Sequence, residues 1–248
     1  ENYKISRVYV LDRENSLEVP NEMNSFIDLF INDDWNEYIY SQLLKKFWKN
    51  SLEIIKVDQV NQKPVTIHQK LNFKQKIKKC LQFFTKLNRG FLSTRDDYFF
   101  ISTSLPLKSE LTLQVKLGQI PKIWDKIDVP KNSIQIEKRK WKLNYNKKLK
   151  DKFLSIACNL IPLNVPTAYL EGYNSLLQIP KKNKWPISPK VIFTSNAYIA
   201  DDVAKIYTAE KVEKKTKLII GQHGGHMGTS PFAYHEEHQL TISDKWLS

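Results

Sequence analysis

The sequence predicts an α/β fold with a mostly parallel, Rossmann-like sheet and helices on both faces. Two observations predict it. Short β-branched apolar runs alternate with longer segments of helical periodicity along the chain, and such alternation is typical of crossover connections between parallel strands. In addition, the runs VIFTSN and LIIGQ are apolar almost throughout, as expected for strands that are buried on both faces.

The expected strands are short runs of β-branched and aromatic residues that end in turn-forming or small polar residues. In chain order they are SRVYVLD (6–12), LEIIKVD (52–58), DYFFISTSLP (97–106), PKVIFTSNA (189–197), KLIIGQHGG (217–225) and LTISDKWL (240–247).

The expected helices are longer segments in which apolar residues recur at intervals of three and four. In chain order they are residues 32–50, 71–89, 109–124, 152–179 and 201–215. Capping residues mark three of the starts, and they are Asp33 or Asp34, Ser109, and Asp201 or Asp202. The expected breaks are Gly90, Pro121, Pro162 and Pro166.

The composition of the 248 residues excludes several classes of protein. With 41% hydrophobic and 12% aromatic residues, the chain is neither disordered nor fibrous. No apolar run approaches the roughly 18 residues of a membrane-spanning helix, and the first residues lack the features of a signal peptide. Cys80 and Cys158 are far apart and are expected to be free thiols in a reducing compartment. We therefore expect a cytoplasmic protein.

The net charge of +13 comes mainly from lysine, because only five of the 39 basic residues are arginine. A protein that reads nucleic-acid sequence usually depends on arginine, so no nucleic-acid partner is expected. Residues 125–150 form the least regular part of the chain and are predicted to be a lysine-rich excursion. Within it, residues 137–152 interleave lysines with Trp141 and Tyr145, so RNA binding and contact with an anionic membrane at the inner face of the plasma membrane stay open as alternatives.

The stretch LIIGQHGGHMG (218–228) is the most distinctive motif, because it concentrates glycine and histidine at the end of a predicted buried strand. Ligands of parallel sheets bind beyond the carboxyl ends of the strands. Residues 102–104 and 194–196 are polar groups at two further strand ends. The sequence therefore predicts a site at this edge of the sheet.

Three chemical interpretations of this motif compete. Metal binding by His223, His226, His235 and His238 is disfavoured, because both histidine pairs are three residues apart and no cysteine is near. A nucleotide-binding loop is unsupported, because no glycine-rich phosphate signature matches GQHGGHMG, although a phosphate contact stays open as an alternative. We favour a general base at His223, with a purely structural turn as the alternative.

Further candidates are polar residues near the same predicted edge. Glu236 and Glu237 are positioned to orient a histidine or to bind a sugar hydroxyl, although exposed charge is the commoner meaning. Ser195 and Asn196 are expected either to line the site or to cap the helix that begins near Asp201. Two further residues complete the candidates. Glu171 is expected at the cleft, with a helix end stopped by Gly172 as the alternative, and His238 is expected to contact substrate.

Four motifs of the sequence resemble successive motifs of a transferase family found in bacterial O-antigen and surface-polysaccharide gene clusters. They are IPLNVPTAYLEGY (161–173), PKVIFTSNA (189–197), KLIIGQHGGHMG (217–228) and HEEHQLTISDKWLS (235–248). The resemblance covers residues 97–248 well and the first ninety residues only in outline. The strand–His–Gly arrangement is more distantly similar to CDP-glycerol glycerophosphotransferases and capsule glycosyltransferases, which have the two-domain GT-B architecture.

The resemblance implies an enzyme in which His223 is the catalytic base, supported by His226 and Glu237, while Gln222, Gly224 and Gly225 shape the turn. It implies a nucleotide-sugar or CDP-polyol donor as substrate, a lipid-linked or saccharide acceptor, and neither a metal nor a separate cofactor. It also implies that residues 1–248 are a single acceptor-side domain, that a C-terminal donor-binding domain is missing, and that this fragment is inactive alone. The alternatives from other classes are a metal-dependent hydrolase and a basic nucleic-acid-binding protein.

Overall fold

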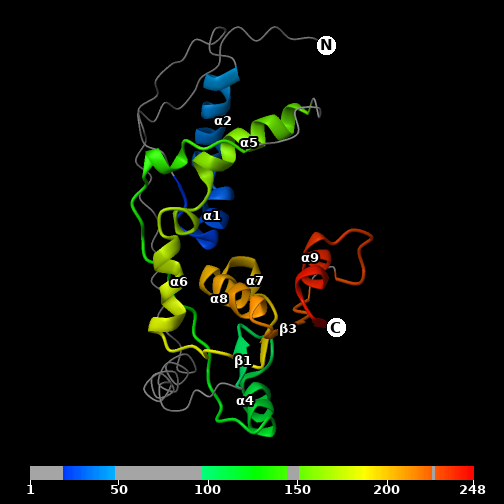
Figure 1. Cartoon of the computed structure of the whole chain (residues 1–248). Helices are drawn as coiled ribbons and strands as arrows, with labels where there is room; N and C mark the ends of the chain where they lie inside the picture. Colours follow the sequence, from blue (N-terminus) through cyan, green and yellow to red (C-terminus); the bar gives the residue numbers. More distant parts are fainter. Residues whose placement is uncertain (1–18, 48–96, 144–150, 225–226) are drawn as a thin grey trace, which may run out of the picture. The chain divides into compact units, whose positions relative to one another are not determined.

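The computed structural model describes residues 19–47, 97–143, 151–224 and 227–248 (Figure 1). The chain forms two compact units, Glu1–Gln69 with Lys131–Glu171 and Lys70–Pro130 with Gly172–Ser248. The strands predicted at 6–12 and 52–58 and the helix predicted at 71–89 lie outside the described residues. The single domain expected over residues 1–248 stays a prediction.

The described part of the first unit is helical. Its elements are α1 (Met23–Phe30), α2 (Asp33–Phe47), the 3-10 helix η1 (Ile136–Arg139), α5 (Lys152–Asn164) and the 3-10 helix η2 (Thr167–Tyr169). The ring of Phe26 in α1 meets the buried Trp35 of α2 edge-on, with centroids 5.7 Å apart. This contact joins two amphipathic helices, of which α1 was not predicted.

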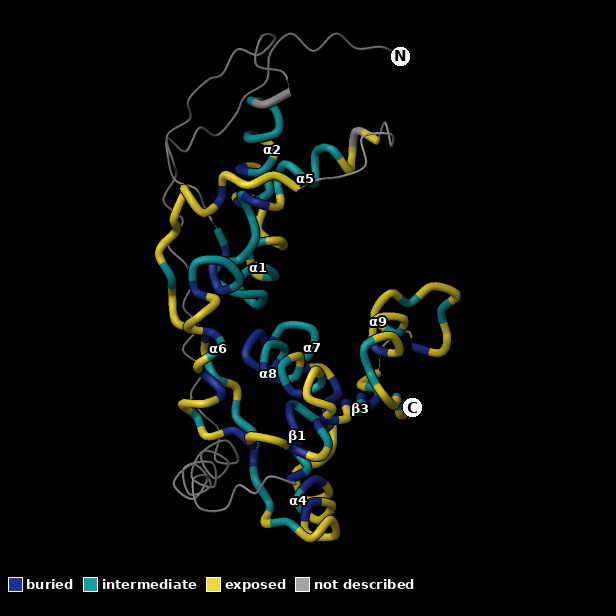
Figure 2. Tube along the Cα trace, viewed as in Figure 1, coloured by how far each residue is buried: buried dark blue, intermediate teal, exposed yellow. Residues whose placement is uncertain are grey.

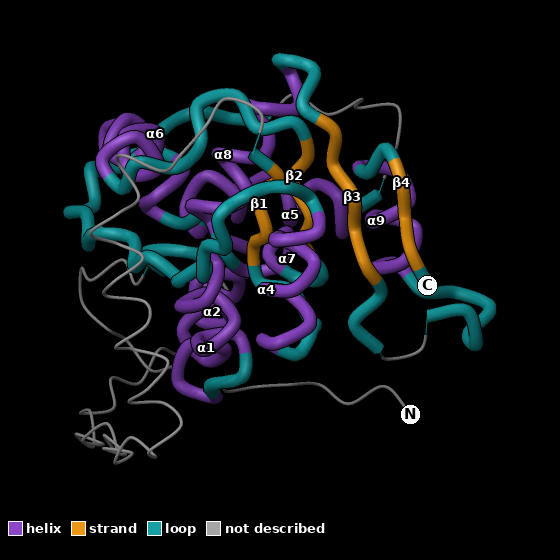
Figure 3. Tube along the Cα trace, turned by 90° about the horizontal axis from the view of Figure 1, so that it is seen from below, coloured by secondary structure: helices purple, strands orange, loops and turns teal. Residues whose placement is uncertain are grey.

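The second unit contains a four-stranded parallel sheet with the strand order β1-β2-β3-β4 (Figure 3). The strands are β1 (Tyr98–Ile101), β2 (Val191–Thr194), β3 (Lys217–Gly221) and β4 (Lys245–Leu247). Ile101, Thr194 and Ile220 stand opposite one another in neighbouring strands. The carboxyl ends of β1, β2 and β3 therefore end at the same level.

Helices flank this sheet, which confirms the predicted α/β class. They are α4 (Leu107–Lys116), α6 (Tyr173–Lys182), α7 (Ala197–Ala200), α8 (Asp202–Glu213) and α9 (Tyr234–Ile242). Tyr207 of α8 is 2% exposed, and its ring meets the rings of Phe99 and Trp185 edge-on at 5.5 and 5.0 Å. Figure 2 shows buried residues concentrated along α8, whereas the loop before α9 is mostly exposed.

Two predicted boundaries are wrong, namely the start of the last strand and the start of the helix predicted at 109–124. Residues 240–242 belong to α9 rather than to a strand, and β4 begins only at Lys245. The alternation of apolar and polar residues in LTIS satisfies a strand pattern, but it is too short to distinguish a strand from the last turn of a helix. Ser109 does not cap α4, which begins at Leu107 without a side-chain cap and ends five residues before Pro121, with Gly118 at φ 77° just beyond it.

Two further corrections concern caps and prolines. Asn32 rather than Asp33 or Asp34 accepts the first free N–H of α2, with its Oδ1 2.8 Å from the nitrogen of Asp34. Pro162 does not interrupt α5, which continues to Asn164. A proline lacks only its own N–H donor, and the last-turn carbonyls of Pro162 and Leu163 accept hydrogen bonds from Nη1 of Arg139 at 3.2 and 3.3 Å.

Candidate functional site

The polar residues at the ends of β1 and β2 contact one another. The Ser102 hydroxyl donates a hydrogen bond to Oδ1 of Asn196 at 2.5 Å. The Ser195 hydroxyl accepts a hydrogen bond from the backbone nitrogen of Ser104 at 3.1 Å. Ser102 has φ 45°, a left-handed conformation that costs a serine of the order of 1 kcal/mol. The fold therefore keeps a strained turn here in order to bring two polar loops together.

Ser195 and Asn196 do not cap α8, which was the alternative expectation for them. Asp201 has that role, because its carboxylate accepts a hydrogen bond from the nitrogen of Ala204 at 2.9 Å. Ser195 is buried and Asn196 is exposed. Both residues therefore belong to the edge of the sheet, and only Asn196 presents its side chain to solvent.

The end of β3 lies next to Ser195. A Cβ atom on Gly221 would lie 3.0 Å from the Phe193 ring and 3.5 Å from the Ser195 hydroxyl oxygen. Any larger residue at this position would push against the aromatic ring, so the glycine allows β3 to end close to the β2 turn. This close approach brings the start of the QHGG turn to the same edge as Ser195.

Gln222 begins the QHGG turn and is anchored from both sides. Its backbone nitrogen donates to the carbonyl of Leu247 at 2.7 Å, and its side-chain Nε2 lies 3.5 Å from the carbonyl oxygen of Met227. Met227 is buried. The structure therefore gives Gln222 a role in fixing the turn between β3, β4 and the loop that follows.

His223 follows Gln222 directly and is exposed. Within the described part of the chain, its imidazole makes no hydrogen bond or ion pair. Gly224 has φ 108°, a conformation that favours glycine and turns the chain sharply after the histidine. Gly225 and His226 lie outside the described residues, so their expected roles stay predictions. The geometry leaves the His223 ring open to a bound molecule.

The loop after the turn is fastened to the first residues of α9. One carboxylate oxygen of Glu236 accepts a hydrogen bond from the nitrogen of Gly228 at 2.9 Å. Glu237, on the next position of the helix, is exposed and makes no side-chain contact with a described residue that would occupy its carboxylate. Glu236 therefore stabilises the loop, whereas Glu237 is available to bind a ligand.

Gln239 is the polar centre of this region and was not identified from the sequence. It is fully buried, it donates to the Tyr198 hydroxyl, and its Oε1 accepts from the indole nitrogen of Trp246 at 2.7 Å. Its Nε2 also lies 3.5 Å from the sulfur of Met227. These bonds join α7, α9, β4 and the loop after His223. No local sequence pattern identifies Gln239, because the side chains that it contacts come from other elements and loops, namely Tyr198, Met227 and Trp246.

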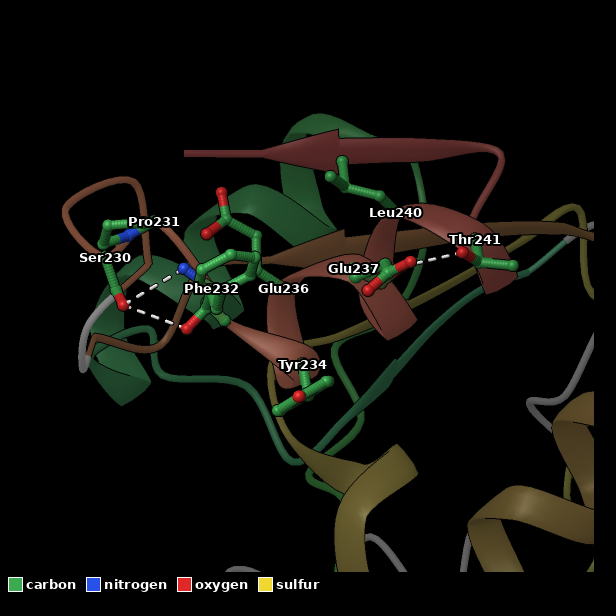
Figure 4. Close-up of a pocket in the computed structure, with 9 residues that line it drawn as sticks. Ser230, Pro231, Phe232, Tyr234, Glu236, Glu237, Leu240 and Thr241 are labelled. Carbon is green, nitrogen blue, oxygen red and sulfur yellow. Dashed lines mark hydrogen bonds between the residues drawn. The ribbon is translucent and has the colours of Figure 1, made fainter.

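Two cavities border α9. The first has a volume of about 400 Å³ and is lined by Ser230, Pro231, Phe232, Ala233, Tyr234, Glu236, Glu237, Leu240 and Thr241 (Figure 4). The second has a volume of about 390 Å³ and lies between α8 and α9, with His238 and Tyr198 in its wall. The rings of these two residues have centroids 5.9 Å apart, and burial raises the pKa of the Tyr198 hydroxyl. The predicted residues Glu237 and His238 therefore line different cavities.

Glu171 belongs to the first unit and has partners of its own. Its carboxylate forms an ion pair with Arg139 at 2.7 Å and accepts from the nitrogen of Gln135 at 3.0 Å. Burial acts to raise the pKa of Glu171, but the hydrogen bonds from Arg139 and Gln135 outweigh it and the pKa lies below its ordinary value. Gly172 is the N-cap of α6 and does not end a helix. The expected substrate contact of Glu171 stays a prediction, and what the structure describes is a carboxylate that holds a loop.

Neither a metal site nor a membrane-spanning helix occurs within the described ranges. No group of three or more His, Cys, Asp or Glu side chains there could hold a metal ion. None of the helices described is long and apolar enough to cross a membrane. The lysine-rich segment 137–152 is described only in part, with Lys138, Lys140 and Trp141 exposed around η1.

The edge of the sheet thus combines an exposed imidazole with hydroxyl and amide groups from two neighbouring strand ends. Such groups can orient a polar substrate and accept a proton from it. A protein-family model described as LIC12162 family transferase matches residues 1–248. No curated protein matches the chain, and no solved structure matches it.

Proposed function

The chain belongs to the LIC12162 family of transferases, and from this premise we propose that it acts in the assembly of a bacterial surface polysaccharide such as an O-antigen. It transfers a sugar or polyol-phosphate group from a nucleotide-activated donor to a hydroxyl group of a saccharide or lipid-linked acceptor. The resemblance of its motifs to glycosyltransferases of GT-B type supports this choice of reaction. Work on lipid-linked acceptors also suits a lysine-rich protein at the inner face of the plasma membrane.

In the proposed mechanism, the imidazole of His223 takes the proton of the acceptor hydroxyl. The acceptor oxygen attacks the anomeric carbon of the sugar, or the phosphorus of the polyol phosphate. The bond to the leaving nucleotide breaks, and the nucleotide departs with the electron pair. An in-line attack of this kind inverts the configuration at the anomeric carbon. The proton remains on His223 until it exchanges with solvent.

One observation carries the proposal. His223 is an exposed histidine on the first turn after a buried parallel strand, at the edge where Ser102, Ser195 and Asn196 also gather. This is the edge at which parallel sheets bind their ligands. The ring has no partner within the described residues that would compete for its basic nitrogen, and Gly224 clears the space beyond it.

The decisive experiment compares His223→Ala with His235→Ala. Both residues are exposed histidines of the same unit, but only His223 follows a strand end. Transfer of radiolabel from a panel of nucleotide sugars and CDP-polyols to endogenous acceptors is measured in membranes of the source strain with the native gene deleted and the variant expressed. Loss of a general base is expected to lower the rate at least about a hundredfold in His223→Ala. We expect His235→Ala to retain the wild-type rate.

Equal transfer by His223→Ala and wild type would contradict the proposed role of His223. The control also addresses the metal-dependent hydrolase, because that alternative needs His235 as a ligand. Release of free label into water by the wild type, lost in both variants, would therefore favour the hydrolase.

A further inference from the structure

The first cavity beside α9 combines strongly exposed aromatic rings with a carboxylate. We call it the α9 pocket, and it is formed by the nine residues from Ser230 to Thr241 shown in Figure 4. It presents the aromatic rings of Phe232 and Tyr234 together with the carboxylate of Glu237. These three side chains are exposed and do not pack into the core.

The two aromatic rings are strongly exposed. Phe232 is 84% exposed and Tyr234 is 82% exposed, more than any other large apolar side chain among the described residues. Burial of an aromatic side chain normally stabilises the fold by a few kcal/mol. Because these two rings are exposed, they contribute little of that stabilisation. Their exposure is therefore a feature that a bound molecule, rather than the core, has to explain.

The segment that carries these rings is held in place. The Ser230 hydroxyl donates to the carbonyl of Phe232 at 2.9 Å and lies 3.4 Å from its nitrogen. Just before this segment, Met227 is buried and the backbone nitrogen of Gly228 donates to the carboxylate of Glu236, which follows the segment in the chain. Pro231 further restricts the backbone. The rings are thus displayed by a fixed loop.

The charged side chains that line the α9 pocket are Glu236 and Glu237, which favour a ligand without negative charge. No lysine or arginine occurs between residues 223 and 244, in a chain whose net charge is +13. Glu236 and Glu237 lie in the first turn of α9, where the helix dipole stabilises a negative charge. An ionised carboxylate accepts hydrogen bonds and repels phosphate. The pocket therefore suits a ligand that is rich in hydroxyl groups and carries no negative charge.

We propose that the α9 pocket binds a pyranose ring of the acceptor saccharide. The C–H face of the sugar stacks on Phe232 or Tyr234, and Glu237 accepts hydrogen bonds from two neighbouring hydroxyl groups. The Thr241 hydroxyl also lines the pocket; it donates its proton to the carbonyl of Glu237 at 2.7 Å, and its oxygen can accept a hydrogen bond from a sugar hydroxyl. The proposal rests on the proposed transferase function, which it deepens by assigning the acceptor a place separate from the phosphates of the donor.

The connections of the loop support a shared role with His223. Gln222 is bonded to the carbonyl of Met227, and Gly228 is bonded to Glu236 of the pocket wall. Both ends of the loop that follows His223 are therefore tied to one another and to the pocket. A sugar held by the α9 pocket would be positioned relative to the QHGG turn through these bonds.

The test is saturation-transfer difference NMR on the full chain with methyl glycosides of glucose, galactose, mannose and N-acetylglucosamine. We expect saturation of the carbon-bound protons of at least one pyranose ring. Phe232→Ala is expected to weaken that binding about three- to tenfold, as for the loss of one aromatic stacking contact. Glu237→Gln is expected to weaken it about tenfold through loss of a charged acceptor. The matched control is Phe153→Ala, which removes a 73% exposed ring from the other unit and should change nothing.

Absence of saturation transfer from all four glycosides would overturn the proposal, and so would equal binding by Phe232→Ala and wild type. Binding of choline in place of the glycosides would identify a cation site instead. Sedimentation with phosphatidylglycerol vesicles that depends on Phe232 would identify a membrane contact instead. His223→Ala separates this proposal from the proposed function, because it should bind the glycoside as wild type does while losing transfer.

Discussion

Helices α8 and α9 both follow a strand of the same parallel sheet, but they are built differently. Helix α8 begins with the capping carboxylate of Asp201 and buries Val203, Ala204 and Tyr207 against the sheet. Helix α9 has Ala233 as its N-cap residue, which supplies no side-chain hydrogen bond, and the helix buries only Gln239. Apolar side chains of α9 and of the loop before it, including Tyr234, face solvent instead.

The two crossovers therefore contribute unequally to the stability of the fold. The β2–α8–β3 crossover has the apolar packing and capping that hold a parallel sheet together. The β3–α9–β4 crossover has a polar centre at Gln239, the α9 pocket and two exposed rings, which stabilise less and leave groups free to bind a ligand. Sites that bind ligands are commonly found in such less stable parts of a fold. Three predictions test this contrast, in addition to the two given above.

Deleting one tyrosine ring in each crossover is expected to give the largest difference in the free energy of unfolding. Tyr207→Ala removes two edge-on ring contacts and the hydrogen bond from its hydroxyl to the carbonyl of Pro186. We expect it to lower the free energy of unfolding by about 4 kcal/mol, because a buried aromatic residue leaves a cavity. Tyr234→Ala is expected to change it by less than about 0.5 kcal/mol. Urea denaturation followed by circular dichroism measures both, and equal losses would show that the contrast between the helices is wrong.

The second prediction adds the missing cap to α9. Ala233→Ser places a hydroxyl three residues before Glu236, which completes the Ser-x-x-Glu pattern of a capping box. We expect this cap to stabilise the helix by about 0.5–1 kcal/mol. Amide hydrogen exchange across residues 234–242 measures the gain. The matched change Asp201→Ser in α8 replaces one cap by another and should produce little change there, and a gain in α8 instead would contradict the argument.

The smallest expected effect concerns the cap of α8 and its dependence on pH. Burial raises the pKa of Asp201, with the hydrogen bond from Ala204 acting in the opposite direction. Its other oxygen, Oδ2, is buried without a hydrogen-bond partner among the described residues. A raised pKa means that the folded protein holds the proton more tightly than the unfolded chain, so stability from this group is present at low pH. That stability is lost as pH rises from the unfolded value through the raised value.

Asp201→Asn keeps a capping oxygen and removes the charge. We therefore expect its advantage over wild type to be absent at acid pH and to grow as pH rises into the neutral range. The measurement is the free energy of unfolding of both proteins between pH 3 and pH 7, in about half-unit steps. Asp244→Asn is the control of opposite sign, because the hydrogen bond from Lys217 lowers the pKa of Asp244 and its stabilisation is lost on acidification. A parallel pH dependence in the two variants would refute the assignment.

Much of the described fold was predictable from short-range patterns. The α/β class, the position of β2 and β3 and the cap of α8 at Asp201 follow from β-branched runs, helical spacing and a side chain that bonds within three residues. The wrong boundaries have the same origin. At residues 240–242, the local pattern fits both a strand and a helix, and the burial of Gln239 decides in favour of the helix.

The sequence indicated which polar residues end neighbouring strands, but not which of the polar side chains near this edge hold the fold and which stay exposed. Parallel strands end at one edge, so the meeting of Ser102 with Asn196 follows from the fold class. The sequence could not show that Glu236 fastens a loop while Glu237 is available, because the two residues are identical and adjacent. Nor could it show that Glu171 is held by Arg139, 32 residues away along the chain.

Short-range patterns in the sequence were enough to predict the class of the fold and the positions of β2 and β3. These depend on periodicity and on residues within a few positions of one another. Only the tertiary structure decided which polar side chains are used for folding and which are left exposed. Gln239 is the clearest case, because its bond to the Tyr198 hydroxyl joins residues 41 positions apart. A buried polar group needs a partner, and only the folded chain determines which partner is within reach.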